Sequence, residues 1–176
     1  SVGCPLLYAS STVANWQVKT AYGRDRLKDE ARLDASPTPS IILRPSAPFG
    51  PPLKSHTPRH TESFFPLADL LRRSPIVPLI GDGAYRRQPL FLPDFADAAL
   101  QLIEEGAWGA RFDIGGGEAL SFKEIILSLG RAMGRSPKVI SLPPRLFALA
   151  ARVHPDFDPE LIRSISEDET TNNGPL

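Results

Sequence analysis

The segment Val2-Gly-Cys-Pro-Leu-Leu-Tyr-Ala9 is followed by the hydroxyl cluster Ser10-Ser-Thr12 and then by Tyr22-Gly-Arg-Asp-Arg26. Within it, Leu6–Ser10 is a short apolar run, which predicts a buried strand. Tyr22–Ala35 places apolar residues on adjoining turns, which predicts a helix. A strand, a helix and a further strand in this order favour parallel pairing across the helical connection.

The alternation of strands and helices continues along the chain. Apolar runs predict strands at Ile41–Arg44, Ile76–Ile80, Pro89–Leu92, Arg111–Ile114 and Lys138–Leu142. Helices are predicted at Ser63–Arg73, from Asp94 as N-cap to Glu105, from the capping box Ser121–Glu124 to near Gly134, at Pro144–Val153, and after Asp158. Ser46–Glu62 holds four prolines and is expected to be irregular. The whole pattern predicts an α/β fold with a largely parallel sheet.

Composition narrows the class of protein. The 176 residues suffice for one domain with a sizeable core, and 20 basic residues balance 20 acidic ones. That balance argues against a nucleic-acid or membrane surface as the main partner. The single cysteine, Cys4, excludes an internal disulfide and fits a reducing compartment. No stretch approaches the roughly 20 apolar residues of a membrane span and no signal-peptide pattern is visible, so a cytoplasmic location is expected.

Three further segments carry motifs, in order along the chain. They are Ile41-Ile-Leu-Arg-Pro-Ser-Ala-Pro-Phe-Gly-Pro51, Pro78-Leu-Ile-Gly-Asp-Gly83 with Arg87 and Phe91-Leu-Pro-Asp-Phe-Ala96, and Phe112-Asp-Ile-Gly-Gly-Gly-Glu-Ala-Leu-Ser121. Together with the hydroxyl cluster and the helix led by Tyr22, they resemble the extended short-chain dehydrogenase/reductase family of sugar-nucleotide epimerases and dehydratases. The resemblance covers nearly the whole chain, and the short interval between Ser11 and Tyr22 looks most like atypical members.

The resemblance implies a partial Rossmann-like parallel sheet with a smaller C-terminal α/β substrate lobe. Residues 1–62 would be the end of a dinucleotide-binding domain, 63–167 the substrate-binding lobe and 168–176 a frayed tail. In this family a glycine-rich nucleotide loop precedes the segments found here, so the chain is expected to be the C-terminal part of a longer protein. The implied cofactor is NAD or NADP, bound by the full-length protein.

Tyr22 and Arg26 are the first candidate catalytic pair. A neutral phenol is a poor base unless a nearby cation stabilises its phenolate, and a basic side chain four residues on shares its helix face. The family has Lys at that position. Arg26 can stabilise a phenolate, but its planar fork does not replace an ammonium that bonds the nicotinamide ribose. The resemblance gives both residues catalytic and cofactor-binding roles; the alternative is an aromatic at a helix start beside a solvated charge.

The hydroxyl cluster is predicted to lie at the carboxyl end of a strand, the edge where open α/β sheets bind ligands. By the resemblance, Ser11 orients the substrate oxygen, with Thr12 as the alternative for this role. Ser10 would contact the cofactor and Thr12 the substrate. The alternative is that these hydroxyls cap the local backbone as the strand ends.

Arg87 lies seven residues before Asp94, a spacing that the family uses for an arginine on a nucleotide-sugar phosphate. A guanidinium suits this task because its fork pairs with two phosphate oxygens. The neighbouring Arg86 is an alternative for this role, one residue away. The other alternative is that Arg86 and Arg87 form a basic pair on the surface.

The segment after the second strand implies more contacts. By the resemblance, Pro45 and Ser46 lie beside the nicotinamide and Phe49 beside the substrate. Ala47 stands where many relatives have Asn, and Phe49 where they have Tyr, which weakens a nucleotide sugar as the substrate. No metal site is expected, because Pro58 interrupts the pair His56 and His60.

Two functions of different classes remain open. One is an NAD(P)-dependent epimerase, dehydratase or reductase that acts by hydride transfer on a nucleotide sugar or a similar small hydroxyl or carbonyl substrate. The other is a non-catalytic relative with a structural or assembly role, like an accessory subunit of respiratory complex I. An exposed sheet edge also favours self-association, so a homodimer is expected.

These 176 residues alone are expected to show no NAD(H) or NADP(H) binding at submillimolar concentration and no turnover. The family holds the dinucleotide pyrophosphate on its glycine-rich loop, and contacts at the nicotinamide end are too few to offset the entropy lost on binding. Calorimetric titration of the chain with each dinucleotide measures this. Saturable micromolar binding would mean that the nucleotide site lies within this chain.

Overall fold

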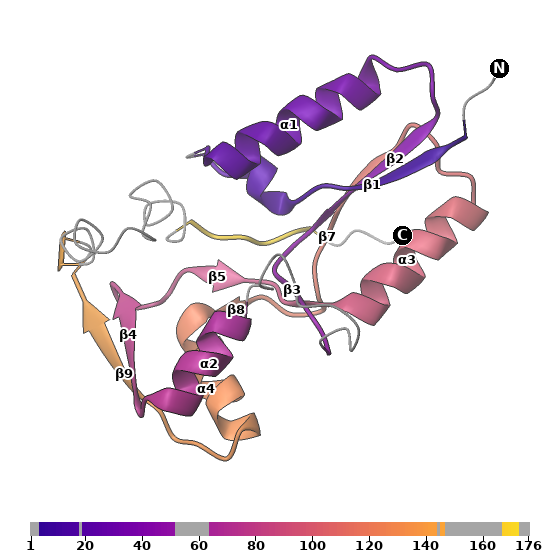
Figure 1. Ribbon diagram of the computed structural model, residues 1–176. Coiled ribbons are helices and arrows are strands. Elements are labelled where there is room, and N and C mark those ends of the chain that lie inside the picture. The colour runs from indigo at the N-terminus through magenta and orange to yellow at the C-terminus, as the bar shows by residue number, and fades with distance from the viewer. Residues whose placement is uncertain (1–3, 18, 52–63, 144, 147–166, 173–176) are drawn as a thin grey trace.

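A three-stranded parallel sheet organises the first part of the chain, in a computed structural model that describes residues 4–17, 19–51, 64–143, 145–146 and 167–172. Its strands are β1 (Leu6–Ala9), β2 (Ser40–Pro45) and β7 (Arg111–Ile114), with β2 in the centre. Helix α1 (Ala21–Asp34) connects β1 to β2, as a parallel crossover requires. Helix α3 (Leu92–Glu104) lies on the opposite side of this sheet from α1 (Figure 1).

The central strand β2 explains why this sheet forms. Its first four residues are all buried, and Ile41 and Leu43 have no exposed surface. A continuous apolar run is typical of a strand covered on both faces. On one face these side chains form a core with Leu90, Leu102 and Ile114, so that α3 and β7 are held against β2.

A second, smaller body follows the first. Strands β4 (Ile76–Ile80) and β9 (Lys138–Leu142) pair in parallel, and helices α2 (Phe65–Arg73) and α4 (Phe122–Ala132) pack with them. Its core contains six buried residues: Leu67, Leu71, Val77, Leu79, Ile125 and Ile126. These residues do not belong to the core beneath β2, so the structure has two separate hydrophobic centres.

Short elements join the two bodies. A 3-10 helix, η1 (Thr12–Asn15), follows β1, and β3 (Pro48–Phe49) pairs in parallel with β6 (Leu90–Phe91). Strand β5 (Arg86–Arg87) pairs antiparallel with β8 (Leu120–Ser121). Of these two-residue strands, β6 lies within the predicted strand Pro89–Leu92, whereas β3, β5 and β8 were not predicted, because two residues contain no repeat.

Several predictions from the sequence are confirmed. Strands β1 and β2 are parallel with α1 between them, and β4, β7 and β9 have the predicted bounds. Ser121 and Glu124 form the predicted capping box. Asp94, in contrast, is not an N-cap: α3 begins at Leu92 after Phe91, because a proline in the first turn suits a helix start, and Asp94 lies in that first turn.

The predicted domain division differs from the packing. Helix α3 and strand β7 belong to the span 63–167, yet they pack on β2 because their apolar residues complete its core. Residues 168–172 are also not a frayed tail, since Glu169 is buried and bonded to several elements. The helices predicted at Pro144–Val153 and after Asp158 lie outside the described residues, apart from Arg145 and Leu146. Within the described ranges, no helix is long and apolar enough to cross a membrane.

The turn after β7 gives a sharp test of the packing. A Cβ on Gly116 would lie 1.9 Å from the carbonyl oxygen of Pro89, whereas one on Gly117 would meet nothing within 4 Å. We expect Gly116→Ala to lower the free energy of unfolding by about 2 kcal/mol. Gly117→Ala should change it by less than about 0.5 kcal/mol. Denaturant unfolding of both variants measures this, and equal effects would contradict the close approach of Gly116 to Pro89.

Candidate functional site

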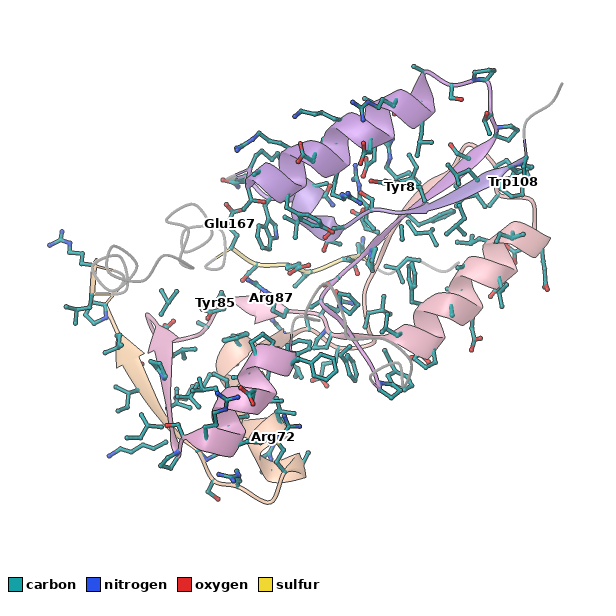
Figure 2. The ribbon with its side chains drawn as sticks, in the orientation of Figure 1. Tyr8, Arg72, Tyr85, Arg87, Trp108 and Glu167 are labelled. Carbon is teal, nitrogen blue, oxygen red and sulfur yellow. The ribbon has the colours of Figure 1, made fainter. Side chains whose placement is uncertain are left out.

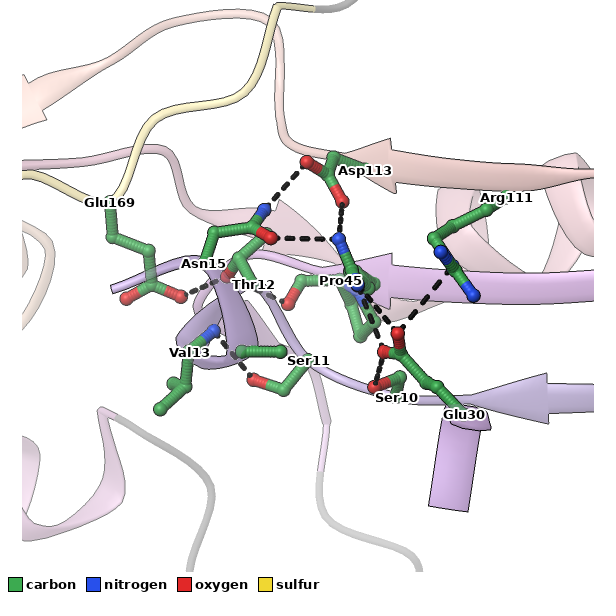
Figure 3. Close-up of polar contacts among 12 residues, drawn as sticks. Ser10, Ser11, Thr12, Val13, Asn15, Glu30, Pro45, Arg111, Asp113 and Glu169 are labelled. Carbon is green, nitrogen blue, oxygen red and sulfur yellow. Dashed lines mark hydrogen bonds and ion pairs between the residues drawn. The ribbon is translucent and has the colours of Figure 1, made fainter. Parts of the chain in front are cut away.

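The carboxyl end of β1 carries the predicted hydroxyl cluster. The side chain of Ser11 accepts a hydrogen bond from the backbone N–H of Val13 at 3.3 Å and so acts as N-cap of η1 (Figure 3). The expected alternative, capping of the local backbone, therefore describes what Ser11 does in this structure. Its own hydroxyl proton is not used in that bond and can be donated elsewhere.

Ser10 faces a different environment. Its hydroxyl donates to Glu30 of α1 at 2.5 Å, and Arg44 of β2 donates two hydrogen bonds to the same carboxylate, at 2.9 and 2.5 Å (Figure 3). The Glu30 side chain is only 3% exposed. Burial by itself raises the pKa of Glu30, but the hydrogen bonds from Arg44 and Ser10 outweigh it, so the pKa lies below its usual value.

The network around this ion pair extends to the third strand. Arg44 also donates to Asn15 of η1 at 2.7 Å, and Asn15 donates to Asp113 of β7 at 2.7 Å. The guanidinium of Arg111 lies 3.5 Å from Glu30. These polar contacts therefore connect α1, η1, β2 and β7 with Ser10, which directly follows β1.

Tyr22 lies in the first turn of α1 and is half exposed, at 52%. The side chain of Thr20 caps this helix by accepting from the N–H of Gly23. The guanidinium of Arg26 lies 5.2 Å from the centre of the Tyr22 ring and 5.5 Å from that of Tyr8. These distances are typical of a cation packed on aromatic faces. The predicted pair is therefore adjacent, with a second tyrosine beside it.

Tyr8 differs from Tyr22 in its surroundings. Its hydroxyl donates to Asp29 at 3.0 Å, and burial together with this bond raises the pKa of Tyr8 to about 12. Asp29 also lies 3.6 Å from Arg26. Among the described residues, Nε of Arg26 has no hydrogen-bond partner, so this guanidinium retains a donor.

The turn after β2 lies beside η1. The carbonyl of Pro45 accepts from Thr12 at 3.2 Å, and Ser46 is completely buried with its hydroxyl donating to the carbonyl of Glu169 at 3.3 Å. Ala47 has a φ of 37°, in the left-handed region, and its N–H donates to the Glu169 carboxylate at 3.3 Å. Pro45 and Ser46 thus lie near Thr12, but Ser46 is closed off from solvent.

Arg87 is buried, in contrast to its exposed neighbour Arg86. Its guanidinium packs on the rings of Trp16 and Tyr85 at 5.6 and 5.2 Å, and Figure 2 shows Tyr85 and Arg87 next to each other. It donates to the carbonyl of Glu167 at 2.5 Å and lies 3.4 Å from the carboxylate of Glu169. Burial lowers the pKa of Arg87, although the Glu169 charge opposes this effect. The surface-pair interpretation of Arg87 is therefore wrong.

The structure brings some predicted residues together and leaves others apart. Thr12, Ser46 and Arg87 all contact Glu169, whereas Ser10 faces Glu30 instead. Phe49 lies in β3, where its ring packs against Phe64 and Phe91. Sequence reasoning missed Glu30 and Glu169, because a lone glutamate in a helix or near a terminus carries no motif.

A cavity of about 540 Å³ opens next to these contacts. It is lined by residues 12 and 15–17 on one side and by residues 167–170 on the other. In the part of the chain that the structure describes, no three His, Cys, Asp or Glu side chains are grouped to hold a metal ion. His56 and His60 lie outside the described residues.

Comparison with known proteins identifies the fold. No family model and no curated protein sequence matches the chain. Among solved structures, it is similar to a dTDP-glucose 4,6-dehydratase from Bacillus anthracis in complex with NAD, at 17% identity and a TM-score of 0.64, over 79% of this chain and 49% of the other. A UDP-glucose 4-epimerase from Thermotoga maritima gives 20% identity and a TM-score of 0.62, over 79% and 50%. One from Thermus thermophilus, complexed with NAD, gives 20% and 0.62, over 91% and 62%.

The α/β fold of nucleotide-sugar epimerases and dehydratases, predicted from the sequence, is therefore confirmed. The chain spans about half the length of most of the structures cited above. Two of these three proteins were crystallised with NAD, a cofactor of the predicted kind.

The buried ion pair gives a prediction with a defined pH dependence. The pKa of Glu30 is lower in the folded chain than in the unfolded chain, so its ionisation stabilises the fold above about pH 4. This contribution is lost as the pH falls through the folded-state pKa. At neutral pH, Glu30→Gln should lower the free energy of unfolding by about 3 kcal/mol.

The difference between Glu30→Gln and the unmodified chain should shrink as the pH falls from 7 to 3. Denaturant unfolding across that range measures it. Glu104→Gln, on the exposed face of α3, is the control and should show almost no difference at either pH. A difference for Glu30→Gln that stays constant with pH would contradict the ionised pair.

Proposed function

We propose that the chain is part of an NAD(P)-dependent enzyme that transfers hydride to or from a nucleotide sugar or a similar hydroxyl or carbonyl substrate. The observation that carries the proposal is the Arg26 guanidinium on the half-exposed ring of Tyr22, in the helix that follows the ligand-binding end of β1. It is supported by the shared fold with dehydratases and epimerases, several of which are complexed with NAD. A homodimer and a cytoplasmic location stay predictions.

The residues fit the nicotinamide end of such a cofactor in part. Tyr22 is accessible to a reacting carbon, whereas Nε of Arg26 is a buried donor without a partner among the described residues and is not exposed to a ribose. Ser10 and Ser46 fit less well than predicted, because their hydroxyls are bonded to Glu30 and to the Glu169 carbonyl. When bound, the nicotinamide accepts or supplies the hydride.

The residues of this chain would then transfer the proton to or from the substrate oxygen. In reduction, the phenol of Tyr22 gives its proton to the substrate oxygen, and in oxidation the phenolate takes it back. The guanidinium of Arg26 packs on the Tyr22 ring at 5.2 Å and so helps to orient the phenol. Ser11 accepts from Val13, so its remaining hydroxyl proton is available to donate to the same substrate oxygen.

A second candidate is a non-catalytic protein with a structural or assembly role. It is favoured by the packing of Arg26 between Tyr8 and Tyr22, since this arginine replaces the lysine of the family and is occupied by aromatic contacts. The two candidates differ in whether the Tyr22 hydroxyl has any function beyond packing.

Substitution of Tyr22 separates them. In the full-length protein, we expect Tyr22→Phe to lower turnover by at least about 100-fold, because the proton donor is lost while the ring remains. Tyr8→Phe is the matched control: it removes the other hydroxyl beside Arg26 and should leave turnover within about twofold. Chromatography of the products formed from dTDP- and UDP-sugars in the presence of NAD(P) measures turnover, because an epimerase or dehydratase returns the hydride and leaves no net change in NAD(H). Circular dichroism verifies folding. Equal turnover in all three proteins, or none in the unmodified one, would support the assembly role.

A further inference from the structure

The segment Glu167–Asn172, called the strap below, makes polar contacts with both bodies. Its six residues are Glu, Asp, Glu, Thr, Thr and Asn, so it buries no apolar side chain. Glu167 accepts from the N–H of Gln17, beyond η1, at 2.7 Å, and Asp168 accepts from the N–H of Arg86, in β5, at 2.7 Å. The N–H of Thr171 donates to Gln88 at 2.7 Å.

At the centre of the strap, Glu169 is held by donors from three separate elements. Its carboxylate accepts from the hydroxyl of Thr12 at 2.5 Å and from the N–H of Ala47 at 3.3 Å, and lies 3.4 Å from Nε of Arg87. The carboxylate is thus surrounded by a hydroxyl, a backbone N–H and a buried guanidinium. Such a group of donors is typical of an anion-binding site. The same donors would suit a phosphate oxygen.

The wall of the adjoining cavity supplies an independent observation. Trp16 lines it, is 8% exposed, and packs on the Arg87 guanidinium. Within the described ranges, its indole N–H is buried without a hydrogen-bond partner. A buried donor without an acceptor costs folding free energy. Because this donor lies beside the groups that bind Glu169, an anion larger than a carboxylate would gain a hydrogen bond from it.

A ligand can compete with the strap for the hydrogen-bond donors that hold it. Because none of its six described residues has an aliphatic or aromatic side chain, the strap is held mainly by charge and hydrogen bonds, which an anion at the same donors can replace. A phosphate carries more charge than a carboxylate and three acceptor oxygens. The cavity of about 540 Å³ leaves room next to Glu169 for the rest of such a molecule.

We propose that Glu169 is an internal substitute for the phosphate of a ligand, and that the strap closes the site until a diphosphate displaces it. The site then consists of Thr12, the N–H of Ala47, Arg87 and Trp16. This inference rests on the proposed function for the ligand class, a nucleoside diphosphate derivative. The strap makes binding competitive, so the apparent affinity equals the intrinsic affinity multiplied by the fraction of molecules in which the strap is released.

The test uses inorganic pyrophosphate as the probe and the fluorescence of Trp16 as the readout. Trp108→Phe is introduced into the full-length protein first, because Trp108 lies far from Arg87 at the other end of the sheet (Figure 2). On this background, Glu169→Gln should bind pyrophosphate at least about tenfold more tightly than the parent, because the competing charge is removed. Glu104→Gln removes the same charge from the exposed face of α3 and should bind like the parent.

A second variant allows the test to be made even if Glu169→Gln does not fold. Asp168→Ala removes the acceptor for the N–H of Arg86 and leaves the Glu169 carboxylate in place, so pyrophosphate affinity should also rise, by a smaller factor. Unchanged or weaker binding by folded Glu169→Gln or Asp168→Ala would overturn the proposal, because Glu169 would then be a structural ion-pair partner only.

The pyrophosphate experiment and the turnover experiment can fail separately, so they distinguish the strap proposal from the proposed function. Tighter pyrophosphate binding without nucleotide-sugar turnover would support the strap and contradict the enzyme. Turnover with equal pyrophosphate affinity in the parent and Glu169→Gln would support the enzyme and contradict the strap.

Discussion

The buried ion pair between Glu30 and Arg44 is the interaction on which the arrangement of the first body depends. A carboxylate this deeply buried is tolerated only with a paired cation and satisfied oxygens, and Arg44 and Ser10 provide both. Because one partner lies in α1 and the other in β2, the pair fixes where the helix crosses the sheet. The position of Tyr22, two turns earlier in the same helix, follows from it.

The same principle operates at the boundary between the two bodies, with a different result. Arg87 is nearly as buried as Glu30, but its carboxylate partner, Glu169, comes from a short polar segment rather than from a packed helix. The α1 pair is backed by a hydrophobic sheet, whereas Glu169 is held by polar contacts alone. Two buried ion pairs in one chain therefore differ in how firmly the surrounding structure holds them.

The sequence predicted those parts of the fold that local patterns control. Apolar runs gave the bounds of β4, β7 and β9, and the Ser121–Glu124 spacing gave a helix start, since each depends on neighbouring residues only. Contacts between distant residues were not predictable. Glu169 meets Thr12 across 157 positions, and no periodicity records such a pairing. For the candidate site, the pairing of Tyr22 with Arg26 could be foreseen from helical spacing, but the burial of Arg87 could not.

Ala47 shows how a single backbone position constrains the chain beyond its burial. Its φ of 37° costs an alanine roughly 1 kcal/mol or more, and the peptide is held there by two bonds: its N–H donates to Glu169 and its carbonyl accepts from Leu90. Glycine adopts this conformation freely and asparagine tolerates it, whereas valine or isoleucine would add severe strain. We therefore expect only a few small residues to be accepted at this position, a narrower choice than an ordinary buried alanine would face.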